Sequence, residues 1–515
     1  MYNNTRRHYK GSSKPLRPSS TPSSRQCTTR ELVLAFILFV LLYFFFFYAN
    51  NQESRVKKLK QQPTYIKHDT LCSVTLCNPT GKCSNWKPDQ HYTWSDLSQA
   101  RVFRDLATIQ LNKGCQLKIK VEKSLEESEW LIIPEGVTEC SDSGYGVLCR
   151  NFVEMDLQSN VLIMAKEMES LMKEQLNQNQ EIILVQPAKE EPQNKKVDVT
   201  LISQFTVNRL DTFSKAIEAW NGPISATIYL TNPNDIKDLI SYFENEKNVE
   251  TYARVIITLV KPNYLDNTHL AYPINHLRNL AITESSTDYI FVIDADFTPS
   301  KNLYSYIRSQ LIPYAIHNSA SMPSTAWVVP CFAIREEFSD LPLPETYNEL
   351  RRLVGKDVAY ITDPGAGHGP TLATEIAMVR PLLMGDPLAY EVCYESQWEP
   401  YYVVHRSAPL YDARFRNQGG DKQSHALHLN AEGYRFMVLR QVFMVHKDHS
   451  TFVWPNGGFE RSQKATTNWN YFVGFMQEIE GIYGKSARWP RGCSANSIGW
   501  QDQRRDTVGL AAGAV

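Results

Sequence analysis

The sequence has little net charge, few structure-breaking residues and no excess of one residue type. Its 54 Lys and Arg residues balance 55 Asp and Glu residues, so the formal net charge is -1. A globally basic nucleic-acid-binding protein is therefore not expected, because no field of one sign is available to hold phosphates. With 43% hydrophobic residues, 24 Gly and 27 Pro in 515 positions, the chain is neither largely disordered nor collagen-like. Its length allows about two to four domains, or one large enzyme domain with appendages.

Several motifs of hydrolases and zinc proteins are also absent. The chain contains no HExxH, no GxSxG and no CxxC pair. A zinc protease, a serine hydrolase or a paired-cysteine zinc site is therefore not predicted. No Asn-x-Ser/Thr glycosylation acceptor occurs beyond residue 49, because Asn78 is followed by Pro79.

One long hydrophobic run is present near the N-terminus. Leu32 to Ala49 (LVLAFILFVLLYFFFFYA) is uncharged over about 18 residues, near the minimum for a membrane-spanning helix. Four consecutive Phe leave no polar face for a buried core helix, and residues 50–53 offer no small-residue cleavage site for a signal peptide. Lys and Arg precede the run, with no acid before Glu31. The pattern predicts a cytoplasmic N-terminus and a single-pass type II membrane protein.

Cysteines cluster just beyond this run. Six of the ten lie between Cys72 and Cys149, and only Cys331, Cys393 and Cys493 follow. Such clustering in an oxidising lumen favours disulfides over metal binding, although the sequence leaves the pairing open. The short, Phe-rich run suits the thinner membranes of the early secretory pathway, so we expect the protein in the Golgi or the endoplasmic reticulum.

The predicted organisation is an anchor, a stem, a cysteine-rich segment and one catalytic domain. The cysteine-rich segment contains a predicted helix at Val153 to Leu176 and a predicted strand at Glu181 to Gln186. In chain order we expect a disordered cytoplasmic tail (1–31), a transmembrane signal-anchor helix (32–49), a stem (50–70), a Cys-rich luminal segment (71–190), a catalytic α/β domain (197–490) and a C-terminal tail (491–515).

Predicted strands and helices alternate after a charged linker that ends near residue 196. The strands are Val197 to Phe205, Ile224 to Leu230, Ala253 to Val260 and Tyr289 to Ile293, and the helices are Leu210 to Trp220, Pro233 to Lys247 with Asn232 as N-cap, and Asn275 to Glu284. Fully apolar strands alternating with helices predict an α/β fold with a mostly parallel twisted sheet covered on both faces. Ligands of such sheets bind beyond the carboxyl ends of the strands.

A pair of carboxylates follows the last of these strands. Asp294-Ala295-Asp296-Phe297 places two acidic side chains at the end of a buried strand, where both can turn toward one divalent cation. Carboxylate oxygens suit Mg²⁺ or Mn²⁺, which keep open positions for phosphate oxygens. A metal there can neutralise the charge that develops on a departing nucleoside diphosphate. An isolated DxD is a weak signal, and the apolar strand, the small central residue and the following aromatic strengthen it.

The wider sequence resembles glycosyltransferase family 49, which contains LARGE-type and β-1,4-glucuronyltransferase-type enzymes. The resemblance spans roughly residues 197 to 450 and is carried by SQFTVNRLDTFSKAIEAWNGPISATIYL, YPINHLRNLAITESSTDYIFVIDADFTPS, AGHGPT, WEPYYVV, YDARF and GYRFMVL…FMVHK in the family's order. It implies a GT-A-like fold, a UDP-sugar donor, a Mn²⁺-type ion (or Mg²⁺) and inversion at the anomeric carbon.

The resemblance also assigns residues to the metal and to the donor. Asp294 and Asp296 match the DxD pair, and His446 of MVHK matches the histidine that completes the metal site. Arg278 and Asn279 match an Arg-Asn pair that faces the donor, as Asp294 does, and an Arg can bridge phosphate or carboxylate oxygens.

Three further positions are assigned from their place in the predicted sheet or in a family motif. Gln204 and Arg209 lie where the first strand ends, the usual place for nucleoside contacts in such sheets. His368 matches the family's GHxPT segment, which should border the acceptor. Residues 371–375 depart from the family pattern there, which leaves the acceptor undetermined.

An inverting transfer needs a general base for the acceptor hydroxyl. Asp421, in the turn Asn417 to Asp421, is the predicted base. Alternatively, Asp421 has only a structural role as the N-cap of the following helix. The family commonly has Asn at this position, so Asp412 and Glu399 are alternatives.

The sequence thus predicts a lumen-facing, metal-dependent glycosyltransferase with glucuronic acid as the preferred sugar. Transfer of N-acetylglucosamine, galactose or xylose, or a non-catalytic glycan-binding scaffold, are the alternatives. Expected partners are the nucleotide-sugar donor, a glycan or glycoprotein acceptor, and the membrane through the single N-terminal helix. No nucleic-acid partner is expected, and a homo-oligomer is compatible with the sequence.

Overall fold

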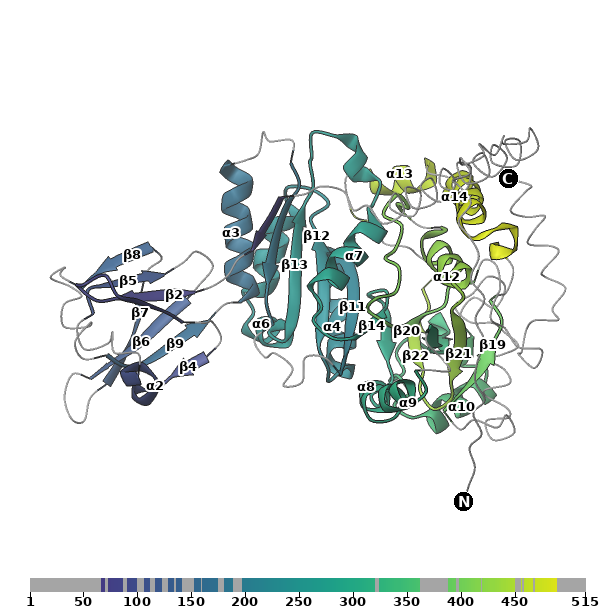
Figure 1. Ribbon diagram of the computed structural model, residues 1–515, viewed down its shortest axis with the longest axis horizontal. Coiled ribbons are helices and arrows are strands. Elements are labelled where there is room, and N and C mark those ends of the chain that lie inside the picture. Colours follow the sequence, from purple (N-terminus) through teal and green to yellow (C-terminus); the bar gives the residue numbers. More distant parts are fainter. Residues whose placement is uncertain are drawn as a thin grey trace, which may run out of the picture. The chain divides into compact units, whose positions relative to one another are not determined.

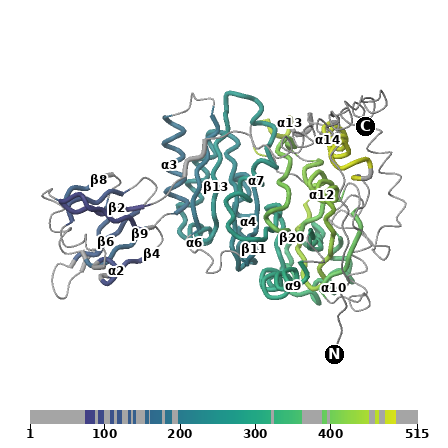
Figure 2. The backbone as a smooth tube through the Cα atoms, viewed as in Figure 1, coloured from purple at the N-terminus to yellow at the C-terminus, as the bar shows by residue number. Residues whose placement is uncertain are grey.

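The structure is a computed structural model (Figure 1, Figure 2). It describes residues 66–488 except 70–72, 87–89, 100–105, 112–115, 123–127, 134–135, 141–151, 159, 175–179, 189–196, 320–323, 362–387, 395–397, 418, 450–454, 456–457 and 466–467. The predicted tail (1–31), the predicted anchor (32–49), His368 and the C-terminal tail (491–515) lie outside these residues. Among the helices that are described, none has the length and apolar character needed to cross a membrane.

The first part of the described chain is a β-sandwich. One antiparallel sheet has the order β3 (Cys83–Trp86), β2 (Val74–Cys77), β5 (Thr108–Leu111) and β8 (Gly136–Glu139), and the other has the order β4 (Gln90–Tyr92), β9 (Phe152–Gln158), β6 (Gln116–Glu122) and β7 (Ser128–Ile133). Alternate residues of both sheets, such as Leu76 and Ile119, meet in one core together with Leu97 of the short helix α2 (Trp94–Gln99). Period-two alternation of apolar residues produces this arrangement.

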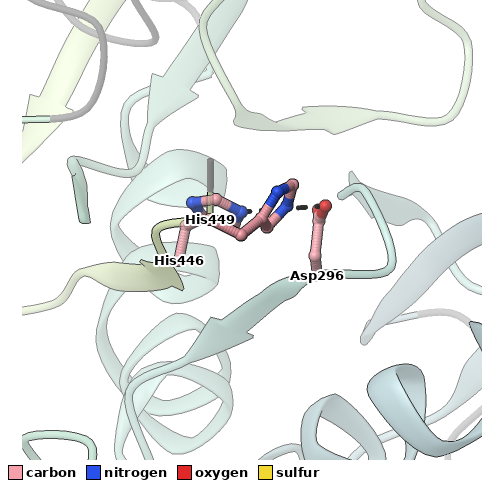
Figure 3. A group of neighbouring side chains, drawn as sticks. All are labelled: Asp296, His446 and His449. Atoms are coloured by element: carbon pink, nitrogen blue, oxygen red, sulfur yellow. Dashed lines mark ion pairs between the residues drawn. The ribbon is translucent and has the colours of Figure 1, made fainter. Parts of the chain in front are cut away.

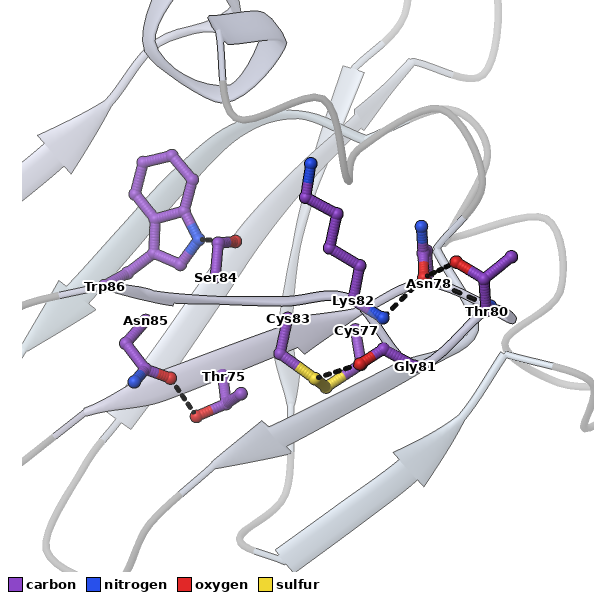
Figure 4. The surroundings of a disulfide bond; sticks show 10 residues. All are labelled: Thr75, Cys77, Asn78, Thr80, Gly81, Lys82, Cys83, Ser84, Asn85 and Trp86. Atoms are coloured by element: carbon purple, nitrogen blue, oxygen red, sulfur yellow. Dashed lines mark hydrogen bonds between the residues drawn. A yellow bond between two sulfur atoms is a disulfide. The ribbon is translucent and has the colours of Figure 1, made fainter.

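A disulfide between Cys77 and Cys83 closes the hairpin of β2 and β3 (Figure 4). Inside the turn, Asn78 Oδ1 accepts hydrogen bonds from the backbone N–H groups of Thr80 (3.1 Å) and Lys82 (2.9 Å). Gly81 takes a φ of 78°, which favours glycine. Cys140 and Cys393 are also disulfide-bonded, whereas Cys331 is a buried free thiol. The preference for disulfides is therefore confirmed at these four cysteines.

A ten-stranded sheet forms the centre of the second part. Its order is β1 (Ile66–Asp69), β10 (Ile182–Gln186), β13 (Val255–Lys261), β12 (Ile224–Tyr229), β11 (Val199–Thr206), β14 (Tyr289–Val292), β20 (Tyr402–His405), β16 (Thr325–Val328), β21 (Arg435–Leu439) and β19 (Ala389–Val392). The strands β13, β12, β11 and β14 run parallel, as predicted. The flanks are mixed, because β10 is antiparallel to β13 and β20 is antiparallel to β14. The α/β class is confirmed, with a more mixed sheet than expected.

Helices cover both faces of this sheet. Leu201 of β11 faces the core shared with α3 (Val161–Glu174), α4 (Leu210–Ala219), α5 (Asp235–Phe243) and α6 (Glu246–Tyr252). The next residue, Ile202, faces the opposite core, to which α7 (Ile274–Glu284), α12 (Asp421–Ala431) and α14 (Asn468–Tyr483) contribute. Successive strand residues point to opposite faces, so an unbroken apolar strand indicates a sheet buried on both sides.

The structure differs from the predicted elements at two places. Residues 152–158 are strand β9 rather than the start of a helix, because Met155 and Leu157 alternate with polar residues and enter the sandwich core. The predicted helix from Pro233 to Lys247 is two helices, α5 and α6. Asn245 separates them, since its side chain accepts the backbone N–H of Lys247 at 3.1 Å. The N-cap of α5 is Asn234, not Asn232.

Candidate active site

The DxD residues lie beyond the carboxyl end of β14. Ile293 still bonds to the sheet, because its N–H donates to the carbonyl oxygen of Ile202 at 2.9 Å. The chain then turns, and the N–H of Phe297 donates to the carbonyl oxygen of Asp294 at 3.2 Å. The strand therefore breaks where the motif begins, as the sequence predicts, and Asp294 and Asp296 face different partners.

A second, four-stranded sheet brings a distant histidine to this turn. Its order is β15 (Phe297–Pro299), β22 (Met444–Lys447), β17 (Cys331–Ile334) and β18 (Ala359–Ile361). The register pairs Phe297 with His446, and the two rings stack with centroids 5.1 Å apart. Strand β22 pairs with β15 on one side and with β17 on the other, and this pairing holds His446 beside Asp296. The two residues are about 150 positions apart in the sequence.

Asp296, His446 and His449 form a compact cluster (Figure 3). His446 Nε2 lies 3.7 Å from Asp296 Oδ2, and one ligand atom from each residue lies within 4.8 Å of the others. Burial opposes ionisation of Asp296, but the neighbouring imidazoles of His449 and His446 hold the pKa of its carboxyl below the usual value. The nearby Asp296 carboxylate in turn raises the pKa of His449. Sequence reasoning missed His449, although its spacing of three residues from His446 was a usable signal.

The donor set of this cluster fits a divalent transition-type ion. One carboxylate oxygen and two imidazole nitrogens are partly buried and converge on one point. Mn²⁺ accepts both carboxylate and imidazole ligands, whereas Mg²⁺ prefers oxygen alone. Three protein ligands leave coordination positions for phosphate oxygens. The three side chains therefore fit a divalent cation.

Asp294 lies in a network of ion pairs next to this cluster. Its Oδ1 accepts from Arg278 Nη2 at 2.9 Å, and its Oδ2 accepts from Lys422 Nζ at 2.7 Å and from the Tyr401 hydroxyl at 2.7 Å. Burial opposes ionisation, but Lys422 and Arg278 hold the pKa of Asp294 well below its usual range. The metal-binding role of Asp294 stays a prediction, since its carboxylate oxygens contact two cations and a phenol.

Arg278 joins Asp294 to Asp421. The Arg278 side chain is 1% exposed, and its Nη1 donates to Asp421 Oδ2 at 2.6 Å and to Asn275 Oδ1 at 2.9 Å. Asp421 is the first residue of α12, and Gly420, with a φ of 80°, occupies the N-cap position. The Asp421 carboxylate is thus turned toward Arg278 rather than toward the helix N–H groups, which corrects the N-cap reading.

The other predicted donor residues lie around the same edge of the sheet. Gln204 of β11 accepts a hydrogen bond from the Tyr272 hydroxyl. Asn279 donates to the Tyr411 carbonyl oxygen at 2.7 Å and accepts the Tyr411 N–H at 3.0 Å, so its amide holds a loop. Arg209 ends the 3-10 turn after β11, and its charge acts on both Asp296 and His449. Their donor-binding roles stay predictions.

The two alternative candidates for the general base, Asp412 and Glu399, pair with different cations. Asp412 is paired with Arg414, whose Nη2 donates to Asp412 Oδ2 at 2.7 Å. Glu399 lies beside Lys422, with 3.2 Å between Oε2 and Nζ. The sequence analysis singled out neither Lys422 nor Tyr401. Tyr401 lies in the WEPYYVV motif, which was a usable signal, whereas Lys422 lies in none of the motifs.

Part of the chain is similar in sequence to a known family. A sequence model of the family described as glycosyl-transferase for dystroglycan matches residues 241–484. This segment contains Arg278, the DxD motif and both clustered histidines. Over this segment the chain is similar to this glycosyltransferase family.

Individual relatives are longer proteins. Mouse xylosyl- and glucuronyltransferase LARGE1 is 31% identical over 265 residues, which cover 50% of this chain and 32% of LARGE1. Human xylosyl- and glucuronyltransferase LARGE2 is 31% identical over 265 residues, which cover 51% of this chain and 34% of LARGE2. The chain therefore spans about a third of the length of these curated relatives. Among solved structures, GalNAc-T7 with UDP, GalNAc and Mn²⁺ aligns with 61% of this chain and 54% of GalNAc-T7, at a TM-score of 0.33 and 9% identity.

Proposed function

We propose that the chain is a metal-dependent, inverting glycosyltransferase of GT-A type that moves a sugar from a UDP-sugar to a glycan acceptor. The observation that carries the proposal is the cluster of Asp296, His446 and His449 beyond the carboxyl end of β14. The similarity of residues 241–484 to the glycosyltransferase family supports the reaction class. Glucuronic acid is the first donor sugar to test and xylose the second, because the names of the relatives include both transfers.

The three clustered side chains would hold the metal, which supplies charge neutralisation of the departing diphosphate. Arg278 and Lys422 hold Asp294 ionised and in one orientation. Arg209 places a cation near Asp296 and His449. A rigid, partly buried site of this kind stabilises charge that develops during transfer better than water does, because its dipoles are already oriented.

The membrane topology is part of the proposal. The predicted anchor at residues 32–49 would place the described chain in the Golgi or endoplasmic-reticulum lumen. The disulfide between Cys77 and Cys83 supports an oxidising compartment. Protease protection of intact vesicles tests it: a C-terminal tag is expected to be protected and an N-terminal tag digested. The reverse pattern would contradict the topology.

The activity is tested by UDP release and product analysis. The full chain in detergent is incubated with a panel of UDP-sugars and glycan acceptors, with Mn²⁺ or with chelator, and the anomeric configuration of the product is read by NMR. We expect Mn²⁺-dependent UDP release, which Asp296→Ala lowers at least about 100-fold, as loss of a group that stabilises transition-state charge does. Asp238→Ala, on the exposed face of α5, is the matched control. Full activity of Asp296→Ala, or activity without metal, would refute the mechanism.

A further inference from the structure

Three carboxylates surround Arg278 and Lys422 next to the candidate metal cluster. They belong to Asp294, Asp421 and Glu399. An inverting transfer requires one carboxylate that can take a proton from the acceptor hydroxyl. Asp294 has both oxygens hydrogen-bonded, and Asp421 and Glu399 differ in how far solvent reaches them, which distinguishes the roles of the three.

Asp421 is turned into the protein. Its side chain is 5% exposed, and Oδ2 accepts from the buried Arg278 at 2.6 Å. Its backbone carbonyl accepts from Asn275 Nδ2 at 3.3 Å and from Ser424 Oγ at 2.9 Å, so the residue is held on both sides. A general base needs a carboxylate oxygen within hydrogen-bond distance of the acceptor hydroxyl. The Asp421 carboxylate instead pairs with the Arg278 guanidinium, so it is poorly placed to act as the base.

Asp294 has both oxygens occupied. Oδ1 bonds to Arg278, and Oδ2 bonds to Lys422 and Tyr401. The low pKa that these cations impose makes the carboxylate a weak proton acceptor. Asp294 therefore suits a permanently charged role.

Glu399 is more exposed than Asp421 and similar in exposure to Asp294 (24%), both oxygens of which are already hydrogen-bonded. Its side chain is 21% exposed, against 5% for Asp421, and it precedes β20 in the same chain segment as Tyr401. Lys422 of α12, 12% exposed, contacts it from one side. Burial raises the pKa of Glu399; the charge of Lys422 opposes this rise, while Asp421 and Asp294 add to it. A carboxyl with a raised pKa is a better proton acceptor near neutral pH.

We propose that Glu399 is the general base of the transfer, in place of Asp421. This rests on the proposed function. As the acceptor oxygen bonds to the anomeric carbon, its proton passes to a Glu399 oxygen. The bond from that carbon to the diphosphate oxygen breaks, and its electron pair leaves with UDP. Neutral Glu399 then returns the proton to solvent, while Lys422 keeps its ion pair with Asp294.

The test compares two isosteric substitutions in the full chain. The substrates are the UDP-sugar and acceptor with the fastest Mn²⁺-dependent transfer in the panel. Glu399→Gln is expected to lower kcat about 100- to 10,000-fold and to abolish the acidic limb of the kcat–pH profile. Binding of UDP with Mn²⁺, measured by calorimetry, should stay within about twofold, because Glu399 is not among the clustered ligands. Asp421→Asn should keep the acidic limb.

Two further variants separate catalysis from folding. Glu391→Gln removes a carboxylate from a comparable pair with Arg435 (2.9 Å, 11% exposed) and should leave kcat within about twofold. Glu399→Asp keeps the charge on a shorter side chain and should retain the acidic limb at a reduced kcat, even if Glu399→Gln does not fold.

The outcomes are distinct. Mn²⁺-dependent transfer by Glu399→Gln within about tenfold of the unsubstituted chain overturns the assignment of Glu399 alone. Loss of the acidic limb in Asp421→Asn and its retention in Glu399→Gln would assign the base to Asp421. Absence of transfer by the unsubstituted chain with every donor would overturn both this assignment and the proposed function.

Discussion

Replacement of Arg278 by Met removes the cation at the centre of the buried network. Arg278 is 1% exposed and bridges Asp294 and Asp421 with donor–acceptor distances of 2.9 and 2.6 Å. Met has a similar length and no charge, so the change tests the ion pairs rather than the packing. After the substitution Asp294 still has Lys422 and Tyr401, whereas Asp421 loses the guanidinium.

The cost follows from the burial of Asp421. Its side chain is 5% exposed, so its charge is left uncompensated where water cannot solvate it. Breaking a buried ion pair by removing one partner costs about 3–5 kcal/mol. At about 2–4 °C per kcal/mol for domains of about 150–250 residues, the expected fall in Tm of the α/β part is at least about 5 °C.

The assay is thermal unfolding of the full chain, followed by tryptophan fluorescence. Arg335→Met is the matched control, since Arg335 pairs with the 81% exposed Asp357. An exposed pair contributes about 0–1 kcal/mol, so this control should shift Tm by only a few degrees. The double variant with Asp421→Asn should recover part of the loss, with a coupling energy of about 1–3 kcal/mol.

Equal Tm values for Arg278→Met and Arg335→Met would refute the reasoning. So would additive effects of Arg278→Met and Asp421→Asn, because additivity would mean that the two side chains do not interact.

Three other outcomes are expected. His449→Ala should weaken Mn²⁺ binding at least about 10-fold in calorimetry, because it removes one of three clustered ligands; unchanged affinity would exclude it from the site. Burial lowers the pKa of His425 to about 3, so below pH about 6.5 the unfolded chain gains a proton that the folded chain refuses. As the pH is lowered below about 6.5, this group should decrease the free energy of unfolding by about 1.4 kcal/mol per pH unit. Thermal unfolding at a series of pH values tests this, and His425→Gln should make the pH dependence weaker. Replacing Cys77 and Cys83 by Ser should destabilise the sandwich by about 2 kcal/mol in denaturant unfolding, since the bond closes a loop with a sequence separation of 6; no change would contradict this.

Much of the fold was accessible to sequence reasoning where one pattern dominated. The apolar runs that became β11, β12, β13 and β14 were identified, because strands buried on both faces have no competing helical period. The strand β9 was missed because its residues run directly into α3, and the combined apolar spacing resembles one long helix. Neither β1 nor β10 could be assigned to the large sheet, since pairing partners are not encoded locally.

The candidate site was only partly predictable. Asp296 and His446 were paired through the family resemblance, and the structure places them 3.7 Å apart. His449 was overlooked, although it lies three residues further on. Asp421 was chosen as base because it is an acid in a flexible turn, and its pairing with Arg278 depends on how α7 packs against α12. No sequence pattern predicts such a contact.

The sequence by itself determined the compartment prediction, the alternation of strands and helices, and the presence of a DxD at a strand end. These depend on local periodicity, on charge placement and on residue type, all of which are properties of neighbouring positions. Only the tertiary structure decided which acid each cation neutralises. Burial and distance decide which cations Asp294, Asp421 and Glu399 contact, and both arise when α7, α12 and the segment before β20 meet at one edge of the sheet. That convergence distinguishes Asp294, which has both oxygens hydrogen-bonded, from Glu399, the proposed base.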